Sequence, residues 1–135
     1  NIVSGRQSVF TRDISMGGNA YTEAVQKELN LPFDSAERVK KGELVGGVSS
    51  EEVKSVVHAM TENVLLEIQK TFDFFKATAS SERIDRILLS GGACSVDGFS
   101  HAIEERFHAS VESFDPFKKI AFDPLKLGLP DPERK

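Results

Sequence analysis

The chain of 135 residues has no tryptophan, one tyrosine, one cysteine and three histidines. A single cysteine, Cys94, excludes an internal disulfide and any metal site built from several thiolates. The histidines are scattered without the spacing of a ligand pair, so we expect no zinc site. Because binding surfaces favour tyrosine and tryptophan, the ten phenylalanines indicate that aromatic side chains here mainly pack a core.

A basic excess and long apolar runs are also missing. The net charge is −4, and the pairs Lys40-Lys41 and Lys118-Lys119 are too short for a basic stripe. Nucleic acid is therefore not an expected partner. The apolar run Ile87–Leu89 is far shorter than the roughly 20 residues that a membrane helix needs, so we expect no direct membrane insertion.

Composition and the two ends of the chain indicate one domain taken from a larger protein. A hydrophobic share of 39% and a charged share of 28% are typical of a globular domain with a core. Residues 1–10 begin directly with a strand and turn pattern, whereas residues 125–135 contain glycine and two prolines without periodicity. We therefore expect a fragment, with apolar surface left open to self-association.

Hydrophobic periodicity predicts an α/β order with a mixed sheet, helices and an all-helical insertion. Asn19 is the expected N-cap of the first helix, and Asp34 or Ser35 that of the second. Ser49 and Glu52 have the spacing of a capping box that opens the longest helix. The expected elements are a hairpin in 1–16, helices in 21–29, 36–41, 49–77 and 98–108, and strands in 84–89 and 110–114.

Three features lie far apart in the sequence but fit one ligand. Gly17-Gly18 and Gly91-Gly92 each follow a strand pattern and precede a helix, where backbone can approach an anion closely. Glu37 and Lys40 are three residues apart, which places an acceptor and a cation on one helix face. Each feature alone is weak, and Glu37 with Lys40 is equally explained as a surface ion pair.

The order of these features resembles the second half of the actin-like ATPases, which have a ribonuclease H-like fold. The matching stretches are Phe10–Gly18, Ala36–Lys40 and Leu88–Gly92. Asp115–Pro124 resembles a further segment of the PilM family of type IV pilus assembly, a segment that the related cell-division protein FtsA lacks. The chain therefore resembles the PilM family over nearly its whole length.

The resemblance implies one wall of a site for ATP with Mg²⁺. It places Gly91-Gly92, with Ala93 next, in an adenosine loop. It places Glu37 and Lys40 at the ribose, and Gly17-Gly18 near the phosphates. Ala93 stands where the family has a third glycine, which leads us to expect altered contact with the base. No catalytic or metal-binding residue is implied, and we do not expect this chain alone to hydrolyse ATP.

The resemblance also implies a domain division and a role. Residues 1–30 and 81–124 would form subdomain 2A, residues 31–80 the helical insertion called subdomain 2B, and residues 125–135 a tail. The expected function is a cytoplasmic scaffold at the inner-membrane face that serves pilus assembly and twitching motility. Its partners would be the N-terminal cytoplasmic peptide of PilN, bound through a lobe absent here, and other inner-membrane pilus proteins.

Two other functions remain open. The helical block 31–80 could be the working surface of a protein-interaction scaffold that does not depend on nucleotide. Alternatively, the chain could belong to an FtsA-like division protein that polymerises on membranes. A C-terminal amphipathic helix would favour the second alternative, and residues 125–135 show no such pattern.

Overall fold

The computed structural model describes residues 1–79, 83–115 and 118. The segment Asp115–Pro124 lies mostly outside the described residues, and the tail 125–135 lies outside them entirely. The order of helices and strands agrees with the order expected from periodicity. The elements are β1 (Ile2–Ser4), β2 (Gln7–Phe10), α1 (Gly18–Leu29), α2 (Phe33–Lys40), α3 (Ser50–Thr78), β3 (Arg86–Leu89), the 3₁₀ turn η1 (Gly92–Ser95), α4 (Phe99–Phe107) and β4 (Ser110–Ser113).

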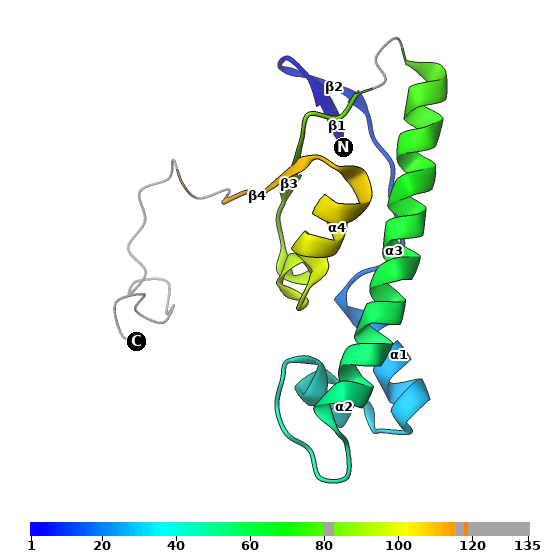
Figure 1. The fold of residues 1–135 in the computed structure, drawn as a ribbon, viewed down its shortest axis with the longest axis vertical. Coiled ribbons are helices and arrows are strands. Elements are labelled where there is room, and N and C mark those ends of the chain that lie inside the picture. Colours follow the sequence, from blue (N-terminus) through cyan, green and yellow to red (C-terminus); the bar gives the residue numbers. More distant parts are fainter. Residues whose placement is uncertain (80–82, 116–117, 119–135) are drawn as a thin grey trace.

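The molecule is elongated because the 29-residue helix α3 runs along most of its length (Figure 1). The β1–β2 hairpin lies beside the end of α3, and α1 and α2 lie beside its beginning (Figure 1). Phe10 fixes the hairpin there, with its ring centroid 5.7 Å from that of Phe74 and 6.1 Å from that of Phe75. Within the described residues, no helix has the length and apolar character needed to cross a membrane.

The capping box predicted at the start of α3 is confirmed. Ser49 Oγ accepts a hydrogen bond from the Glu52 backbone N–H at 3.2 Å, and Glu52 Oε2 accepts one from the Ser49 N–H at 3.0 Å. Two N–H groups that the helix cannot pair internally are thus satisfied. The hydrogen bond from the Ser49 backbone N–H to the Glu52 carboxylate is also the main reason why the pKa of Glu52 is lowered.

The predicted caps of the two shorter helices are wrong. Helix α1 starts earlier than expected, with extended Gly17 as its N-cap and no side-chain cap, so Asn19 lies inside the first turn. Helix α2 starts after Pro32, which places Asp34 and Ser35 within the helix. Proline supplies a fixed φ and lacks the N–H that would need a partner, so α2 begins without a polar cap.

The strands form two separate pairs in the described part of the chain, rather than one mixed sheet. β1 and β2 are antiparallel, with Ile2 opposite Phe10 and an irregular register before Val3. β3 and β4 are parallel, and α4 connects them. These strands are three or four residues long, and no backbone ladder joins the two pairs.

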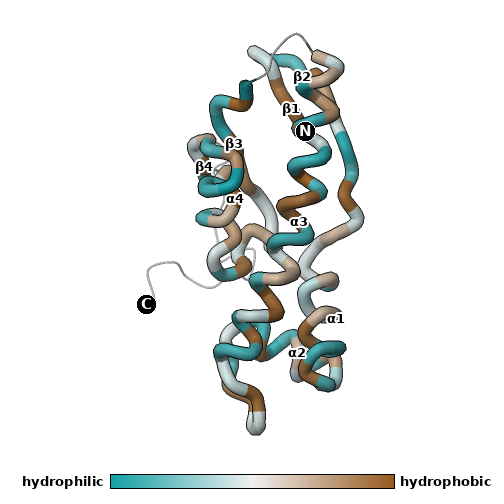
Figure 2. The backbone as a smooth tube through the Cα atoms, turned by 45° about the vertical axis from the view of Figure 1, so that its right-hand side comes forward, coloured by the Kyte–Doolittle hydropathy of each residue, from teal (hydrophilic) through white to brown (hydrophobic). Residues whose placement is uncertain are grey.

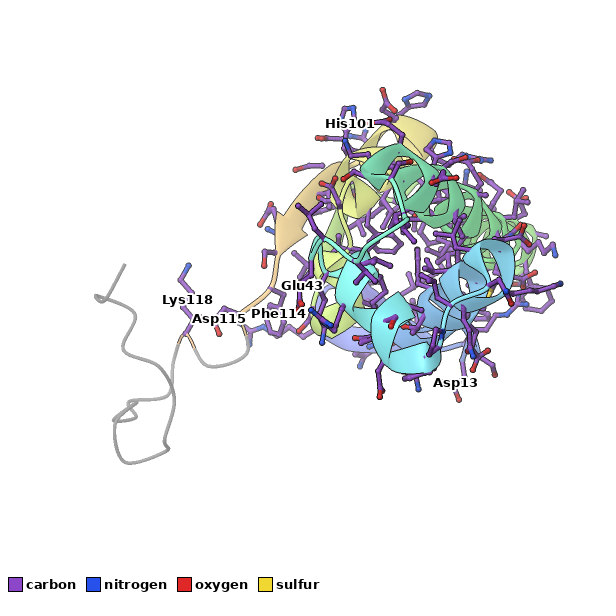
Figure 3. All side chains as sticks on the ribbon, turned by 90° about the horizontal axis from the view of Figure 1, so that it is seen from below. Asp13, Glu43, His101, Phe114, Asp115 and Lys118 are labelled. Atoms are coloured by element: carbon purple, nitrogen blue, oxygen red, sulfur yellow. The ribbon has the colours of Figure 1, made fainter. Side chains whose placement is uncertain are left out.

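The core lies between the helices and follows the predicted apolar stripes. Figure 2 shows hydrophobic segments, coloured brown, along α1 and α3, and both helices contribute residues to the buried hydrophobic cluster. Val25 and Ile103 are almost completely buried. The polar side chains of Asp13, Glu43 and His101 point outward from the body, and Phe114, Asp115 and Lys118 lie away from it (Figure 3). The buried hydrophobic cluster comprises Tyr21, Val25, Ala36, Val39, Val53, Val57, Val64, Leu65, Phe99 and Ile103.

Candidate functional site

The turn after β3 has a backbone that only glycine adopts easily. Gly91 has φ 93° and ψ 170°, a region closed to residues with a side chain. A Cβ built on Gly91 or on Gly92 would meet no atom within 4 Å. Steric crowding within the chain therefore does not explain the two glycines. Open space beside a strained turn is what a ligand needs to approach the backbone.

Ala93 and Cys94 lie in η1, directly after this turn. Among the described non-glycine residues, positive φ occurs at Asn30 and His108 and not at Ala93. The alanine is thus accommodated by the backbone, and the altered contact with the base stays a prediction. Cys94 donates its thiol hydrogen to the Ser90 carbonyl at 3.2 Å, and partial burial raises the pKa of this thiol.

A hydrogen-bonded cluster joins the start of α1 to the end of α2. The Lys40 ammonium donates to the Gly18 carbonyl at 3.2 Å, to Thr22 Oγ1 at 2.8 Å and to Glu37 Oε2 at 2.5 Å. Its side chain is only 11% exposed. Lys40 and Glu37 are therefore not a simple surface pair, because Lys40 also binds the backbone and a side chain of a second helix.

Glu37 carries the strongest electrostatic signature of the cluster. Its hydrogen bond from Lys40, followed by that from Thr22, lowers the pKa of this carboxyl from 4.5 to about 2. Glu37 Oε1 is 3.1 Å from the Lys41 ammonium, which is 63% exposed. The carboxylate is thus ionised at neutral pH, with one oxygen turned into the cluster and the other toward an exposed cation.

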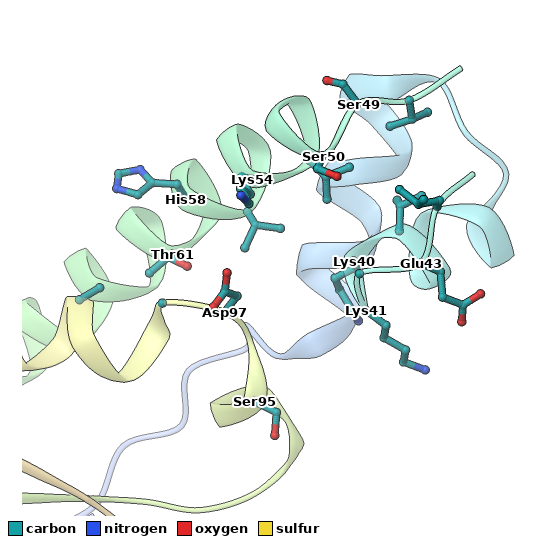
Figure 4. A pocket seen from close by; sticks show the side chains of 18 residues that line it. Lys40, Lys41, Glu43, Ser49, Ser50, Lys54, His58, Thr61, Ser95 and Asp97 are labelled. Atoms are coloured by element: carbon teal, nitrogen blue, oxygen red, sulfur yellow. The ribbon is translucent and has the colours of Figure 1, made fainter. Parts of the chain in front are cut away.

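A cavity of about 610 Å³ opens beside this cluster. Lys40, Lys41 and the following loop form one wall, the first half of α3 forms another, and Ser95 and Asp97 come from the loop that faces them (Figure 4). Gly98 and Ala102 of the α4 region complete that side. The volume and the mixture of apolar and polar walls fit a small organic ligand.

The structure brings together some of the predicted site residues and not others. Gly18, Glu37 and Lys40 are in contact through the cluster, and Lys40 also lines the cavity. Gly91-Gly92 leads into η1, whose last residue lines the opposite wall. The predicted site residues that do not line the cavity are Gly17, Gly18, Glu37, Gly91, Gly92 and Ala93.

Sequence reasoning missed two residues that the geometry makes prominent. Thr22 is fully buried at the centre of the cluster, and no sequence pattern marks it as part of the site. Asp97 lines the cavity. The sequence signal that could have identified it as a site residue is its position directly before Gly98. Contacts across 15 to 22 residues connect Thr22 and Gly18 with α2, so no local pattern could reveal them.

The side chains around the cavity suit an organic anion better than a bare metal ion. Three lysines, Lys40, Lys41 and Lys54, line the cavity with the two acids Glu43 and Asp97. In the part of the chain that the structure describes, no three His, Cys, Asp or Glu side chains form a group that could hold a metal ion.

Two comparisons with known proteins identify the family and the fold. The sequence matches the family described as "Type IV pilus assembly protein PilM" over residues 1–126. The structure is similar in fold to a chain of a solved "PilM-PilN type IV pilus biogenesis complex", with a TM-score of 0.64 and 21% sequence identity. The match covers 81% of this chain and 30% of the solved chain. Because the family match covers most of the sequence, the chain belongs to the PilM family of type IV pilus assembly proteins.

Proposed function

We propose that this chain forms one lobe of an actin-like, ATP-binding scaffold in type IV pilus assembly. The observation that carries the proposal is the Gly91 turn, which is open to solvent and leads through η1 to the wall of the cavity. In this assignment residues 1–30 and 81–124 are subdomain 2A, and residues 31–80 are subdomain 2B. The cavity then lies where the two subdomains meet.

The residues present fit ATP in three respects. The backbone at Gly91 and Gly92 is free of neighbouring atoms, as a base or ribose approaching it requires. Val39, Val53 and Val57 supply apolar surface to the cavity, and Lys41 supplies an exposed positive charge. Bound ATP would add a polyphosphate that carries its own Mg²⁺, which agrees with the absence of a metal-binding cluster among the described residues.

The proposed role is to report nucleotide state to partner proteins at the cytoplasmic face of the inner membrane. ATP would connect this lobe to a second one, and a ligand shifts such an equilibrium only by its different affinity for the two states. The solved relative is a complex of PilM with PilN, which supports PilN as a partner of this protein. We place that contact, and any hydrolysis, in parts of the protein beyond this lobe.

The test is calorimetric titration of Mg·ATP into the full-length protein and into its Gly91→Val variant. The wild type should bind, and the variant should bind at least tenfold more weakly, because a side chain would occupy the open turn. Gly5→Val is the matched control: Gly5 also has positive φ (62°) and no atom within 4 Å of a built Cβ, but it lies in the hairpin turn. Equal effects of both variants, with folded protein by circular dichroism, would contradict the proposal.

A second candidate function is a scaffold that works without nucleotide. It is favoured by Lys40, whose ammonium hydrogens are already matched by three acceptors of the chain. This alternative predicts that partner binding is the same with and without Mg·ATP, in the wild type and in Gly91→Val. Surface-immobilised PilN peptide with the full-length protein in solution is the measurement that separates the two functions.

A further inference from the structure

A second cavity, of about 390 Å³, lies beside the C-terminal half of α3 and shares no lining residue with the first cavity. Gln69, Phe72 and Lys76 line it from one face of α3, because positions three and four residues apart fall on the same side of a helix. The other lining residues come from the end of α4, with its C-cap His108, and from the segment before β3, which includes Arg83. Three segments of the chain thus meet at this cavity.

The direction of the strands places this second cavity at the opposite end of β3 from the Gly91 turn. Arg83 and Ile84 precede β3, whereas Gly91 follows it. Because β3 and β4 are parallel, His108, which lies just before β4, is at the same edge of the strand pair as Arg83. A ligand bound in the second cavity therefore leaves the Gly91 turn free.

The lining of the second cavity is basic in a chain whose net charge is −4. It includes Lys76, Arg83 and Arg106, and none of the described lining residues is acidic. Arg106 is bound through one nitrogen to Glu62 at 2.6 Å, and Arg83 through one nitrogen to Asp85 at 2.8 Å. Since a guanidinium has five N–H donors, both arginines retain donors for a ligand. Lys76 has no ion-pair partner within the part of the chain that the structure describes.

Helix dipoles account for part of this charge. Lys76 and Arg106 are in the last turns of α3 and α4, where a cation interacts favourably with the negative end of the helix. This reason does not apply to Arg83, which precedes a strand. Lys27 is in the last turn of α1, yet it lines neither of the two cavities. The convergence of cations from three segments on one cavity is therefore the feature that indicates an anionic ligand.

Two aromatic rings add apolar surface to the second cavity. Phe72 and Phe107 line it, with their ring centroids 4.9 Å apart in an edge-to-face arrangement, and both are only half-buried. A single phosphate ion would bind the cations and leave the rings in water. A flat lipid surface would not enter a concave site. A peptide that carries both carboxylates and an apolar side chain would use the cations and the rings together.

We propose that the second cavity is a docking site for an acidic peptide segment of a partner protein. Carboxylates of the segment pair with Lys76, Arg83 and Arg106, and an apolar side chain of the segment packs against Phe72 and Phe107. The proposal does not depend on the ATP site, because the two cavities have no residue in common. A partner and a nucleotide can therefore be bound to this lobe at the same time.

The test is fluorescence anisotropy of a dye-labelled peptide of alternating glutamate and leucine, titrated with the full-length protein. The wild type should bind the peptide, and added salt should weaken binding because it screens exposed charges. The same peptide with glutamine in place of glutamate should bind at least tenfold more weakly. The peptide with alanine in place of leucine should also bind more weakly, since it covers less of the two rings.

Lys76→Glu tests whether the peptide binds in the second cavity. It should weaken binding about tenfold, because the change removes one attraction and adds one repulsion. Lys27→Glu is the matched control: Lys27 is also exposed and in the last turn of its helix, so both variants change the net charge equally and lose the same helix-dipole interaction. This control should bind as the wild type does. Arg83→Gln should also weaken binding, and its 84% exposed side chain keeps the proposal testable if Lys76→Glu does not fold.

The outcomes separate the alternatives. Absence of peptide binding in the wild type overturns the proposal, and so does equal weakening by Lys76→Glu and Lys27→Glu. Binding to phosphatidylglycerol vesicles that Lys76→Glu abolishes, with no binding of the peptide, overturns it in favour of a lipid surface. A protein that binds the peptide through Lys76 but does not bind Mg·ATP upholds the docking site and overturns only the proposed function.

Discussion

Lys40 shows what residue spacing can predict and what it cannot. The separation of three residues correctly placed Lys40 and Glu37 on one face of a helix, and they form an ion pair at 2.5 Å. Spacing could not show that the Gly18 carbonyl and Thr22 would approach from another helix. The Lys40 side chain is only 11% exposed, and this burial requires those extra acceptors, because a buried charge is costly unless its hydrogen bonds are satisfied.

Cys94 gives a prediction at the scale of one residue. Partial burial is the main influence on the thiol and raises its pKa, and the bond to the Ser90 carbonyl opposes this only in part. We therefore expect slow alkylation by iodoacetamide at pH 7, with a rate that still increases above pH 9. The measurement is the rate of mass increase of the intact protein between pH 7 and pH 10. A rate that levels off below pH 8 would indicate a thiolate suited to redox sensing instead.

Helix α3 organises the molecule at the scale of elements. It packs against α1, α2 and α4, and its C-terminal half holds the hairpin through Phe74 and Phe75. Its 3.6-residue stripe was readable in the sequence, and Val53, Val57, Val64 and Phe75 are buried as that stripe predicts. The sequence also predicted where the strands lie, but not which strands pair with each other, since strand pairing depends on where the helices place them.

The capping box of α3 supports a second prediction. Ser49→Ala removes the acceptor of the Glu52 N–H, and we expect the free energy of unfolding to fall by about 1 kcal/mol. Ser55→Ala is the control, because Ser55 is exposed in the middle of the same helix, where alanine is the better helix former. Urea unfolding followed by circular dichroism measures both. A loss of the same size in Ser55→Ala would show that the cap is not the cause.

At the scale of the whole molecule, the family match and the similarity in fold point to the same family. This chain, however, corresponds to only a small part of the solved relative. The match spans 30% of the solved PilM chain, so a complete nucleotide site, a second lobe and the partner surfaces are proposals. Several large apolar side chains are exposed, among them Val3, Leu44 and Phe74. The self-association expected from the sequence stays a prediction, since nothing in the structure shows what covers these side chains.

Stability toward acid is a prediction for the molecule as a whole. The pKa of Glu37 is lowered to about 2 by Lys40 and Thr22, and the pKa values of Glu52 and Glu67 are lowered by Ser49 and Lys70 respectively. A carboxyl with a depressed pKa stabilises the fold above its unfolded pKa, near 4.5 for Glu37, and loses this effect as the pH falls toward the folded value.

We therefore expect the free energy of unfolding to be flat from pH 7 to pH 5 and to decrease between pH 4.5 and pH 2. In Glu37→Gln, the decrease in the free energy of unfolding over this pH range should be smaller by about 1 to 2 kcal/mol. This figure is reduced for solvent screening of a partly exposed pair. Urea unfolding at a series of pH values is the measurement. A wild-type stability that rises on acidification would contradict the assignment of these carboxyls.

The sequence by itself determined the order of helices and strands, the apolar stripes, the α3 cap, the need for glycine at Gly91 and the resemblance to the PilM family. All of these depend on local periodicity, local backbone preference or a linear motif. The tertiary structure alone decided that the strands form two separate pairs, that Thr22 joins Glu37 and Lys40, and that Asp97 faces Lys40 across a cavity. These are contacts between residues distant in the chain, and packing of the helices on α3 brings such residues together.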